Sequence, residues 1–458
     1  MEKLKIMTEQ FPQKKLHQKK LHMVSLGCTK NLVDSEVMLG RLREYEISDD
    51  ASAADVIIVN TCGFIDAAKE ESINTVLDLH EQRKENSILV MSGCLTERYR
   101  EEMQADMPEI DIFTGVGDYE KIDQLIATKQ STFSPEVYLA TENSGRVITG
   151  SNYHAYIKIA EGCNQVCSFC AIPSFKGKLH SRSLSSIVKE VTMLVKDGYF
   201  DFSFISQDSS SYGRDMKMSD GLIDLIKGVE AISGVKSARI LYLYPSTTTF
   251  ELIDTIADSK VFQTYYDMPI QHIDNPILKI MKRGFGEKKT IELLAHMKTK
   301  KDAFIRTSLI AGHPGENEMS FEKLCDFMKA YEFDRFNTFG YSNEETTSAY
   351  SLKQISQEII DKRAETLGKI AEENTKTSLK KMIGKTITVV IDGESDEHEY
   401  LLSARPLSWA VDIDGEVLIN DTSDLPVEYG KLYEAKVTEL AGSQLLATLL
   451  RRVDTIDQ

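Results

Sequence analysis

The sequence predicts an α/β protein with three folded domains, and three observations along its 458 residues carry this prediction. Residues 22–128 alternate short apolar runs with helical patterns, which indicates an N-terminal doubly wound parallel sheet. Residues 151–380 resume the alternation over about six strand–helix units, which indicates a central partial (β/α) barrel. Residues 381–450 hold short apolar runs separated by Gly, Asp and Pro, a pattern typical of a small antiparallel β-barrel.

The N-terminal domain carries a cysteine after each of three apolar runs. HMVSLG leads into Cys28, DVIIVN leads into Cys62 and ILVMSG leads into Cys94, and a helical pattern follows each cysteine. In a parallel sheet the carboxyl ends of the strands share one edge, where ligands bind. Three buried core thiols are the alternative, because free cysteine is often buried. The three equivalent strand ends favour one shared metal site.

The remaining segments complete the domain plan. Residues 1–21 are basic and lack the apolar centre of a secretory signal, so we expect a mobile tail there. Residues 129–150 are rich in Ser, Thr and Gly and are expected to form a linker. A long helical pattern covers residues 356–382, with Gly384 as a C-terminal stop. Residues 451–458 are expected to form a second tail.

A second group of cysteines, Cys163, Cys167 and Cys170, follows the first apolar run of the central domain in the string GCNQVCSFC. Three thiolates can hold an iron–sulfur cluster that would take four, which leaves one iron open to a ligand. A structural zinc site is the alternative, but it usually needs paired C-x-x-C units and a fourth ligand nearby. His180, the nearest downstream His, does not have that spacing. Cys325 falls at apolar helical spacing and is expected in the core.

Composition limits the cellular setting and the partners. No apolar stretch approaches the roughly 20 residues that span a bilayer, so we expect a cytoplasmic protein without a membrane segment. Cysteines in that reducing compartment serve as metal ligands or reactive thiols more often than as disulfides. The net charge of −17 favours a basic protein or a small molecule as partner. It disfavours RNA without excluding it, because binding phosphates requires Lys and Arg.

The C-x-x-x-C-x-x-C motif of the second group, with an aromatic residue before its last cysteine, resembles the radical S-adenosylmethionine superfamily. The resemblance implies a [4Fe–4S] cluster whose open iron binds S-adenosylmethionine and whose electron splits it into a 5′-deoxyadenosyl radical. FISQDSSSYG and TSLIAGHPGE resemble strand ends near the cofactor, although a structural hydrogen bond or ion pair is the alternative role for each residue. No catalytic side chain is assigned beyond the cluster ligands. The expected cofactor contacts are Phe169, Gln207, Arg306, Gly312, Pro314 and Glu316.

With both cysteine groups and the small barrel in this order, the chain from about residue 22 to 450 resembles the radical S-adenosylmethionine methylthiotransferase family. The strings LGCTKNLVDSE, NTCGFI, SGCLTERY, GCNQVCSFCAIP and DMPIQH carry the resemblance. It implies a second [4Fe–4S] cluster, held by the N-terminal cysteines, and an OB-like TRAM domain at the C-terminus. One S-adenosylmethionine would donate the methyl group and another would supply the radical. An electron donor and a sulfur source are also implied, and the sequence identifies neither.

Two branches of that family differ in substrate. CTKNLVDSE resembles the RimO type, which adds a methylthio group to the β-carbon of an aspartate in small-subunit ribosomal protein twelve. The alternative is the MiaB type, which modifies an adenosine in transfer RNA. Residues 385–440 contain 13 acidic and 4 basic residues, which suits docking of a basic protein better than contact with phosphates. The sequence therefore predicts the protein substrate.

Overall fold

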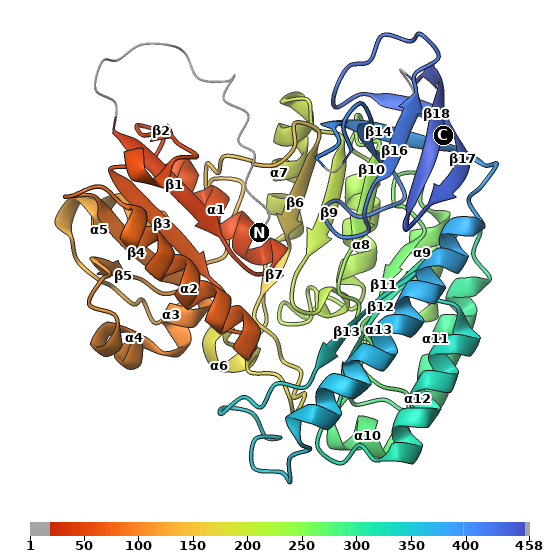
Figure 1. Cartoon of the computed structure of the whole chain (residues 1–458), viewed down its shortest axis with the longest axis horizontal. Coiled ribbons are helices and arrows are strands. Elements are labelled where there is room, and N and C mark those ends of the chain that lie inside the picture. Colours follow the sequence, from red (N-terminus) through yellow and green to blue (C-terminus); the bar gives the residue numbers. More distant parts are fainter. Residues whose placement is uncertain (1–18, 397, 454–458) are drawn as a thin grey trace.

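The computed structural model of the chain describes residues 19–396 and 398–453, so most of the expected N-terminal tail and the end of the C-terminal one lie outside the described residues. The N-terminal domain is a five-stranded parallel sheet of order β2-β1-β3-β4-β5 (Figure 1). Its elements are β1 (Lys20–Ser25), α1 (Thr29–Arg41), β2 (Glu46–Ile47), β3 (Val56–Thr61), α2 (Asp66–Gln82), β4 (Ile88–Gly93), α3 (Cys94–Arg98), α4 (Arg100–Asp106), β5 (Ile112–Phe113) and α5 (Ile122–Thr128).

The central strand β3 shows why the sheet is covered on both faces. All six of its residues are buried, and neighbouring side chains enter opposite cores. Ile58 packs in the core that contains α1, whereas Ile57 packs in the core that contains α2. This is the doubly wound arrangement that the continuous apolar runs predicted. The edge strands β2 and β5, with two residues each, are too short to leave a pattern in the sequence.

The central domain contains two three-stranded parallel sheets, of order β6-β9-β10 and β11-β12-β13. The amide of Ala238 donates to the carbonyl of Val261, and the amide of Leu243 donates to that of Asp267, both at 2.8 Å. These bonds join the two sheets into the predicted partial barrel. Its elements are β6 (His154–Lys158), β7 (Ala160–Glu161), α6 (Ile172–Lys176), β8 (His180–Ser181), α7 (Leu184–Lys196), β9 (Asp201–Ile205), α8 (Gly221–Glu230), β10 (Ser237–Ile240), α9 (Phe250–Asp258), β11 (Tyr265–Asp267), α10 (Asn275–Ile280), α11 (Glu287–Lys298), β12 (Phe304–Ala311), α12 (Glu318–Tyr331), β13 (Arg335–Gly340) and α13 (Gln357–Lys380).

The C-terminal domain is a closed barrel of order β14-β15-β16-β18-β17 (Figure 1). Its strands are β14 (Thr386–Glu394), β15 (Leu402–Pro406), β16 (Val417–Asp421), β17 (Leu432–Ala441) and β18 (Gln444–Arg452). The expected antiparallel pairing holds except between β16 and β18, which run parallel and close the barrel. Among the described residues, no helix combines the length and the apolar character needed to cross a membrane.

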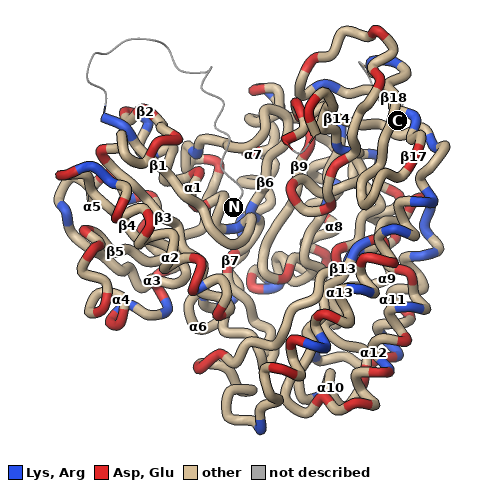
Figure 2. The backbone as a smooth tube through the Cα atoms, viewed as in Figure 1, with Lys and Arg blue, Asp and Glu red and all other residues tan. Residues whose placement is uncertain are grey.

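A buried ion network attaches the barrel to the central domain. Asp201 of β9 lies 2.9 Å from a nitrogen of Arg239 in β10 and 2.8 Å from a nitrogen of Arg405 in β15. Burial pushes the pKa of Asp201 up, but the two guanidinium groups outweigh burial and hold it at about 2. Elsewhere the barrel is acidic at its surface, and acidic positions are spread along its strands and loops (Figure 2). Exposed examples are Glu394, Asp396, Glu399, Asp421, Asp424, Glu428 and Glu439.

Candidate functional site

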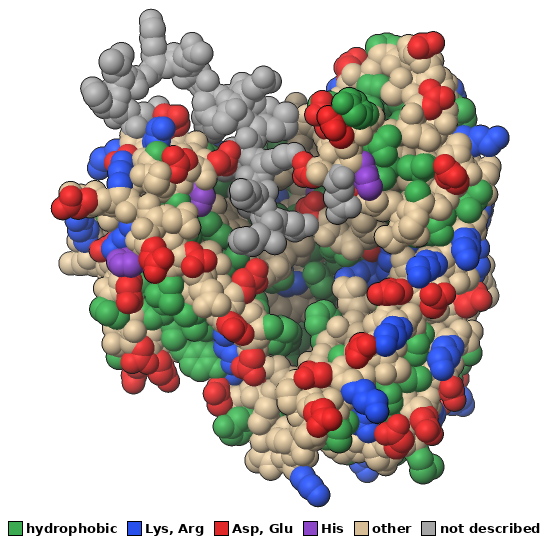
Figure 3. Space-filling model, viewed as in Figure 1, with side chains coloured by type: hydrophobic (Ala, Val, Ile, Leu, Met, Phe, Trp, Pro, Cys, Tyr) green, Lys and Arg blue, Asp and Glu red, His purple; other side chains and the backbone are tan. Residues whose placement is uncertain are grey.

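The two cysteine groups meet at one cavity, which has a volume of about 890 Å³. It lies where the N-terminal domain faces the central domain, and the surface is visibly hollowed there (Figure 3). A loop of the C-terminal barrel, including Val411 and Ile413, completes the wall. All six predicted ligands line this cavity: Cys28, Cys62, Cys94, Cys163, Cys167 and Cys170. Cysteines from two domains therefore share one chamber.

The N-terminal cysteines stand at the carboxyl edge of the sheet, as the strand pattern predicted. Cys28 is the residue before α1, Cys62 follows β3 directly, and Cys94 is the first residue of α3. Gly27 has a φ of +85°, and a Cβ placed there would lie 2.8 Å from the sulfur of Cys62. Glycine is needed at this position both for its backbone conformation and for the close approach of two ligand segments.

The central cysteines lie in a loop that is closed at its base by pairing of β7 with β8. The amide of Gln165 donates to the sulfur of Cys163 at 3.4 Å. The Arg283 guanidinium donates to the sulfur of Cys167 at 3.3 Å, and the Tyr244 hydroxyl contacts the same sulfur at 3.5 Å. The Gln165 amide and the Arg283 guanidinium can each stabilise negative charge on the sulfur that they contact, whereas the Tyr244 hydroxyl donates its proton to the carbonyl of Arg283 at 2.8 Å.

The turn after β12 supports this loop from behind. Burial lowers the pKa of His313 to about 4, so its ring is neutral, and Nδ1 donates to the carbonyl of Pro314. Nε2 is then left to accept from the Ser168 hydroxyl at 3.0 Å. The Ser168 backbone is also bonded on both sides, to Met281 and to Ala349. Ser168 is thus fixed immediately after Cys167, which orders the loop before any ligand binds.

The donor set suits iron–sulfur clusters. Burial raises the pKa of Cys62 to about 11 and the pKa of Cys163 and Cys170 to about 12, and burial also raises the pKa of Cys94. These thiols are protonated at neutral pH in the metal-free chain, and metal binding displaces the protons. Among the described residues, no group of three or more Cys, His, Asp or Glu is arranged to hold a single metal ion. A cubane cluster takes each thiolate on a different iron, so its ligands stand further apart.

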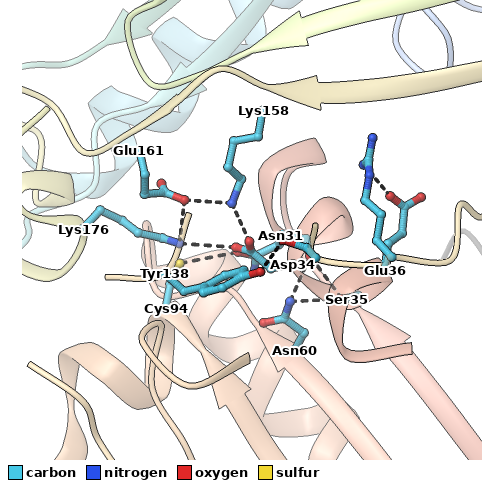
Figure 4. A network of polar contacts seen from close by, with 12 residues as sticks. Asn31, Asp34, Ser35, Glu36, Asn60, Cys94, Tyr138, Lys158, Glu161 and Lys176 are labelled. Atoms are coloured by element: carbon cyan, nitrogen blue, oxygen red, sulfur yellow. Dashed lines mark hydrogen bonds and ion pairs between the residues drawn. The ribbon is translucent and has the colours of Figure 1, made fainter. Parts of the chain in front are cut away.

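A buried network of four charged side chains lies between the two domains, beside Cys94 (Figure 4). The Lys158 ammonium is 2.5 Å from Asp34 Oδ1 and 2.7 Å from Glu161 Oε2, and Lys176 is 3.5 Å from an oxygen of each. Burial pushes the pKa of Glu161 up, but the two ammonium groups outweigh it and hold that pKa well below its usual range. Burial dominates at Asp34 and raises its pKa. Asp34 belongs to α1 and the other three to the central domain, so the network fixes one domain against the other.

Two further ion networks cross the same boundary. Arg146 lies 2.8 Å from Glu36 of α1 and 2.9 Å from Glu190 of α7. Glu344, in the loop after β13, lies 2.6 Å from Arg98 of α3. Each pair is buried, and a buried charge is costly unless it is paired. The N-terminal domain is therefore fixed on several sides of the cavity.

The predicted cofactor contacts divide into two groups. Phe169, Gln207 and Arg306 line the cavity. Gln207 donates to Glu161 and leaves its Oε1 without a partner, whereas Arg306 pairs with Asp267 at 3.0 Å. The other three residues, Gly312, Pro314 and Glu316, lie in the turn after β12, behind the loop that carries the central cysteines. In that turn the amide of Gly312 donates to Oε1 of Glu316. The cavity lining does not include that turn. A contact between any of the six and S-adenosylmethionine stays a prediction.

Two cavity residues, Lys30 and Tyr242, were missed by the sequence reasoning. The Lys30 ammonium lies 3.5 Å from the centroid of the Tyr242 ring, across the domain boundary. Tyr242 has a φ of +64°, which is rare for an aromatic residue. Lys30 could have been noticed as a cation two residues after a strand-end cysteine. The conformation of Tyr242 leaves no signal in the sequence.

Comparison with known proteins follows the three domains. Residues 20–115 match the Uncharacterized protein family UPF0004, residues 157–328 match the radical SAM superfamily and residues 383–450 match the TRAM domain. A solved structure of the radical S-adenosylmethionine methyltransferase TsrM from Kitasatospora setae aligns with a TM-score of 0.54 and 13% identity, over 73% of this chain and 74% of that chain. At that identity the likeness concerns the fold alone.

Curated relatives are far more similar. The ribosomal protein uS12 methylthiotransferase RimO of Sulfurovum sp. (strain NBC37-1) is 82% identical over 94% of this chain and 99% of its own length. The proteins of the same name from Aliarcobacter butzleri (strain RM4018) and Campylobacter jejuni (strain RM1221) are 62% and 55% identical, over 94% and 95% of this chain and 98% and 99% of their own lengths. The chain therefore belongs to the family of ribosomal protein uS12 methylthiotransferases.

Proposed function

We propose that this protein adds a methylthio group to the β-carbon of an aspartate in small-subunit ribosomal protein uS12. The single observation that carries the proposal is the convergence of both cysteine groups on one cavity. Family membership supports the choice of substrate over transfer RNA, since the similar relatives bear the uS12 name. An unactivated C–H bond has no acidic proton, so acid–base chemistry alone cannot replace its hydrogen.

Two [4Fe–4S] clusters and S-adenosylmethionine are the cofactors that we propose. Cys163, Cys167 and Cys170 would hold one cluster, and the cysteines of the N-terminal sheet edge would hold the other. When bound, the first cluster would supply the electron that splits S-adenosylmethionine, and the open iron of the second would hold the sulfur atom that becomes the methylthio group. Each site offers three thiols, so each cluster would keep one iron open.

The side chains of the protein stabilise the cluster ligands, hold the two domains in position and form the walls of the reaction chamber. Arg283 donates to the sulfur of Cys167 and limits the negative charge that builds up there. The networks around Lys158 and Glu344 hold the two domains together, so that a reacting carbon can meet both sites in one chamber. A shared chamber recessed between the domains suits a radical reaction, because an exposed radical would be lost to side reactions.

The acidic surface of the barrel supports docking of a basic protein. The exposed carboxylates repel phosphates but attract Lys and Arg, and such surface charges mainly steer association. We propose 22–128, 151–380 and 381–450 as the three functional domains. The proposed reaction also requires an electron donor and a sulfur source, and we propose both as further partners of the protein.

The test is a comparison of substrates and of cysteine groups. Reduced holoenzyme is incubated with purified uS12 or with transfer RNA, and the products are weighed. We expect the mass of a methylthio group on uS12, and a gain on transfer RNA alone would refute the substrate. Replacing Cys163, Cys167 and Cys170 by Ala should abolish formation of 5′-deoxyadenosine. Replacing the N-terminal group should halve the iron content, preserve 5′-deoxyadenosine and stop sulfur insertion; continued insertion would contradict the assignment.

A further inference from the structure

We infer that Lys30 binds the carboxylate of the substrate aspartate, the group bonded directly to the carbon that reacts. The inference rests on the proposed function and deepens it, because it names the residue that recognises the side chain to be modified. Lys30 is 9% exposed and lines the cavity.

Lys30 differs from the other cations of the cavity wall in its partners. Arg306 pairs with Asp267 at 3.0 Å, and Lys176 lies 3.5 Å from two carboxylates. Arg283 has no carboxylate partner among the described residues, but it donates to the sulfur of Cys167 at 3.3 Å and to the carbonyl of Pro269 at 2.5 Å. Within residues 19–396 and 398–453, no carboxylate forms an ion pair with Lys30 either. Its ammonium lies over the ring of Tyr242 and also hydrogen-bonds that side chain, and Glu161 acts on it only from beyond ion-pair distance. An aromatic face compensates a cation only in part, so a buried ammonium in this setting favours an incoming anion.

The position of this ammonium is set by a constrained backbone. Tyr242 holds its left-handed φ because its amide donates to Asp267 at 3.0 Å and its carbonyl accepts from the Ser209 amide at 3.0 Å. Such strain persists only where the surroundings impose it, and it gathers at functional sites. Lys30 also lies in the first turn of α1, where free backbone amides add positive potential.

Lys30 lines the same cavity as both cysteine groups. Lys30 is two residues after Cys28, and its aromatic partner is two residues before Tyr244, whose hydroxyl contacts the sulfur of Cys167 at 3.5 Å. A carboxylate bound to Lys30 would therefore hold its neighbouring carbon within the chamber that both groups line. The nucleobase of adenosine is uncharged and cannot form an ion pair with Lys30, so Lys30 would also favour an acidic side chain over an adenosine as substrate.

The test crosses an enzyme change with a substrate change. Reconstituted holoenzyme, wild type or with Lys30→Met or Lys30→Arg, is titrated with labelled uS12 that carries either the target aspartate or asparagine in its place. A charge-assisted contact predicts that wild type prefers aspartate by about 10- to 100-fold in affinity or in kcat/KM. Lys30→Met should lose that preference and Lys30→Arg should keep most of it. Lys369→Met, at an exposed ion pair on α13, is the matched control and should behave as wild type.

Three further readouts keep this inference distinct from the proposed function. Iron content and the electron paramagnetic resonance spectra of both clusters should be unchanged in Lys30→Met, as should 5′-deoxyadenosine formation. Loss of the N-terminal cluster would assign Lys30 to cluster binding and overturn the inference. An aspartate preference that survives in Lys30→Met, or that is absent in wild type, would overturn it as well. If wild type transferred no methylthio group to uS12, the proposed function itself would fall.

Discussion

Replacing Lys158 by Met tests whether the buried charge network holds the N-terminal domain on the central one. The change removes an ammonium that lies 2.5 Å from Asp34 and 2.7 Å from Glu161. Both carboxylates stay fully buried, with Lys176 at 3.5 Å from each. Removing one partner of a buried ion pair costs about 3–5 kcal/mol, because an uncompensated charge is left behind. We expect a loss of that size in the free energy of unfolding.

Urea unfolding of the anaerobically reconstituted chain, followed by far-ultraviolet circular dichroism, measures the loss. With a urea m-value of about 2–3 kcal/mol per molar, the midpoint should fall by about 1–2 M. The double variant Lys158→Met with Asp34→Asn should lose less than the single one, since it also removes the orphaned carboxylate. Lys369→Met, at an exposed pair, should leave the midpoint unchanged. A loss below about 1 kcal/mol in Lys158→Met, the size seen at exposed pairs, would refute the reasoning.

Three other perturbations follow from single contacts. Gly27→Ala should lower the iron content of the N-terminal site, because the new Cβ would lie 2.6 Å from the Cβ of Cys62, whereas Gly198→Ala, at a similar φ but with open space around it, should retain iron. The depressed pKa of Asp201 contributes stability that is complete above about pH 3.8 and lost as pH falls toward 2, so wild type should lose about 2 kcal/mol over that range and Asp201→Asn should not; parallel pH curves would contradict this. Glu344→Gln should cost about 3 kcal/mol in urea unfolding, because its buried arginine partner loses its anion, and an unchanged midpoint would count against it.

Much of the fold was predictable from local patterns. The runs before Cys28, Cys62 and Cys94 became β1, β3 and β4, because a strand buried on both faces is apolar at every position. The six strands of the two parallel sheets in the central domain and the long helix α13 were predicted from similar local patterns. The two-residue strands β2 and β5 were not predicted, since a pattern needs more residues than they have.

In the candidate site, too, local features were predictable from the sequence and contacts between distant segments were not. Spacing predicted six cysteines as metal ligands, because ligand type and strand-end position are local properties. The structure brings all six to one cavity, and metal binding by them stays a prediction. The turn of Gly312 and Glu316 was expected at the cofactor, but a contact there stays a prediction, and the turn instead supports the Cys loop through His313. A motif at the end of a strand predicts that the chain turns there, but it does not predict which part of the protein that turn will contact.

The sequence by itself determined the domain order, the parallel sheets and the positions of the cysteines at the strand ends, because each depends on residues close together in the chain. Only the tertiary structure decided that both cysteine groups face one chamber and that Lys30 rests on the ring of Tyr242. Asp34 and Lys158 are 124 residues apart, and their pairing follows from how two finished domains dock. The way the two domains pack depends on which charges are buried and paired across their interface, and no local sequence pattern carries that information.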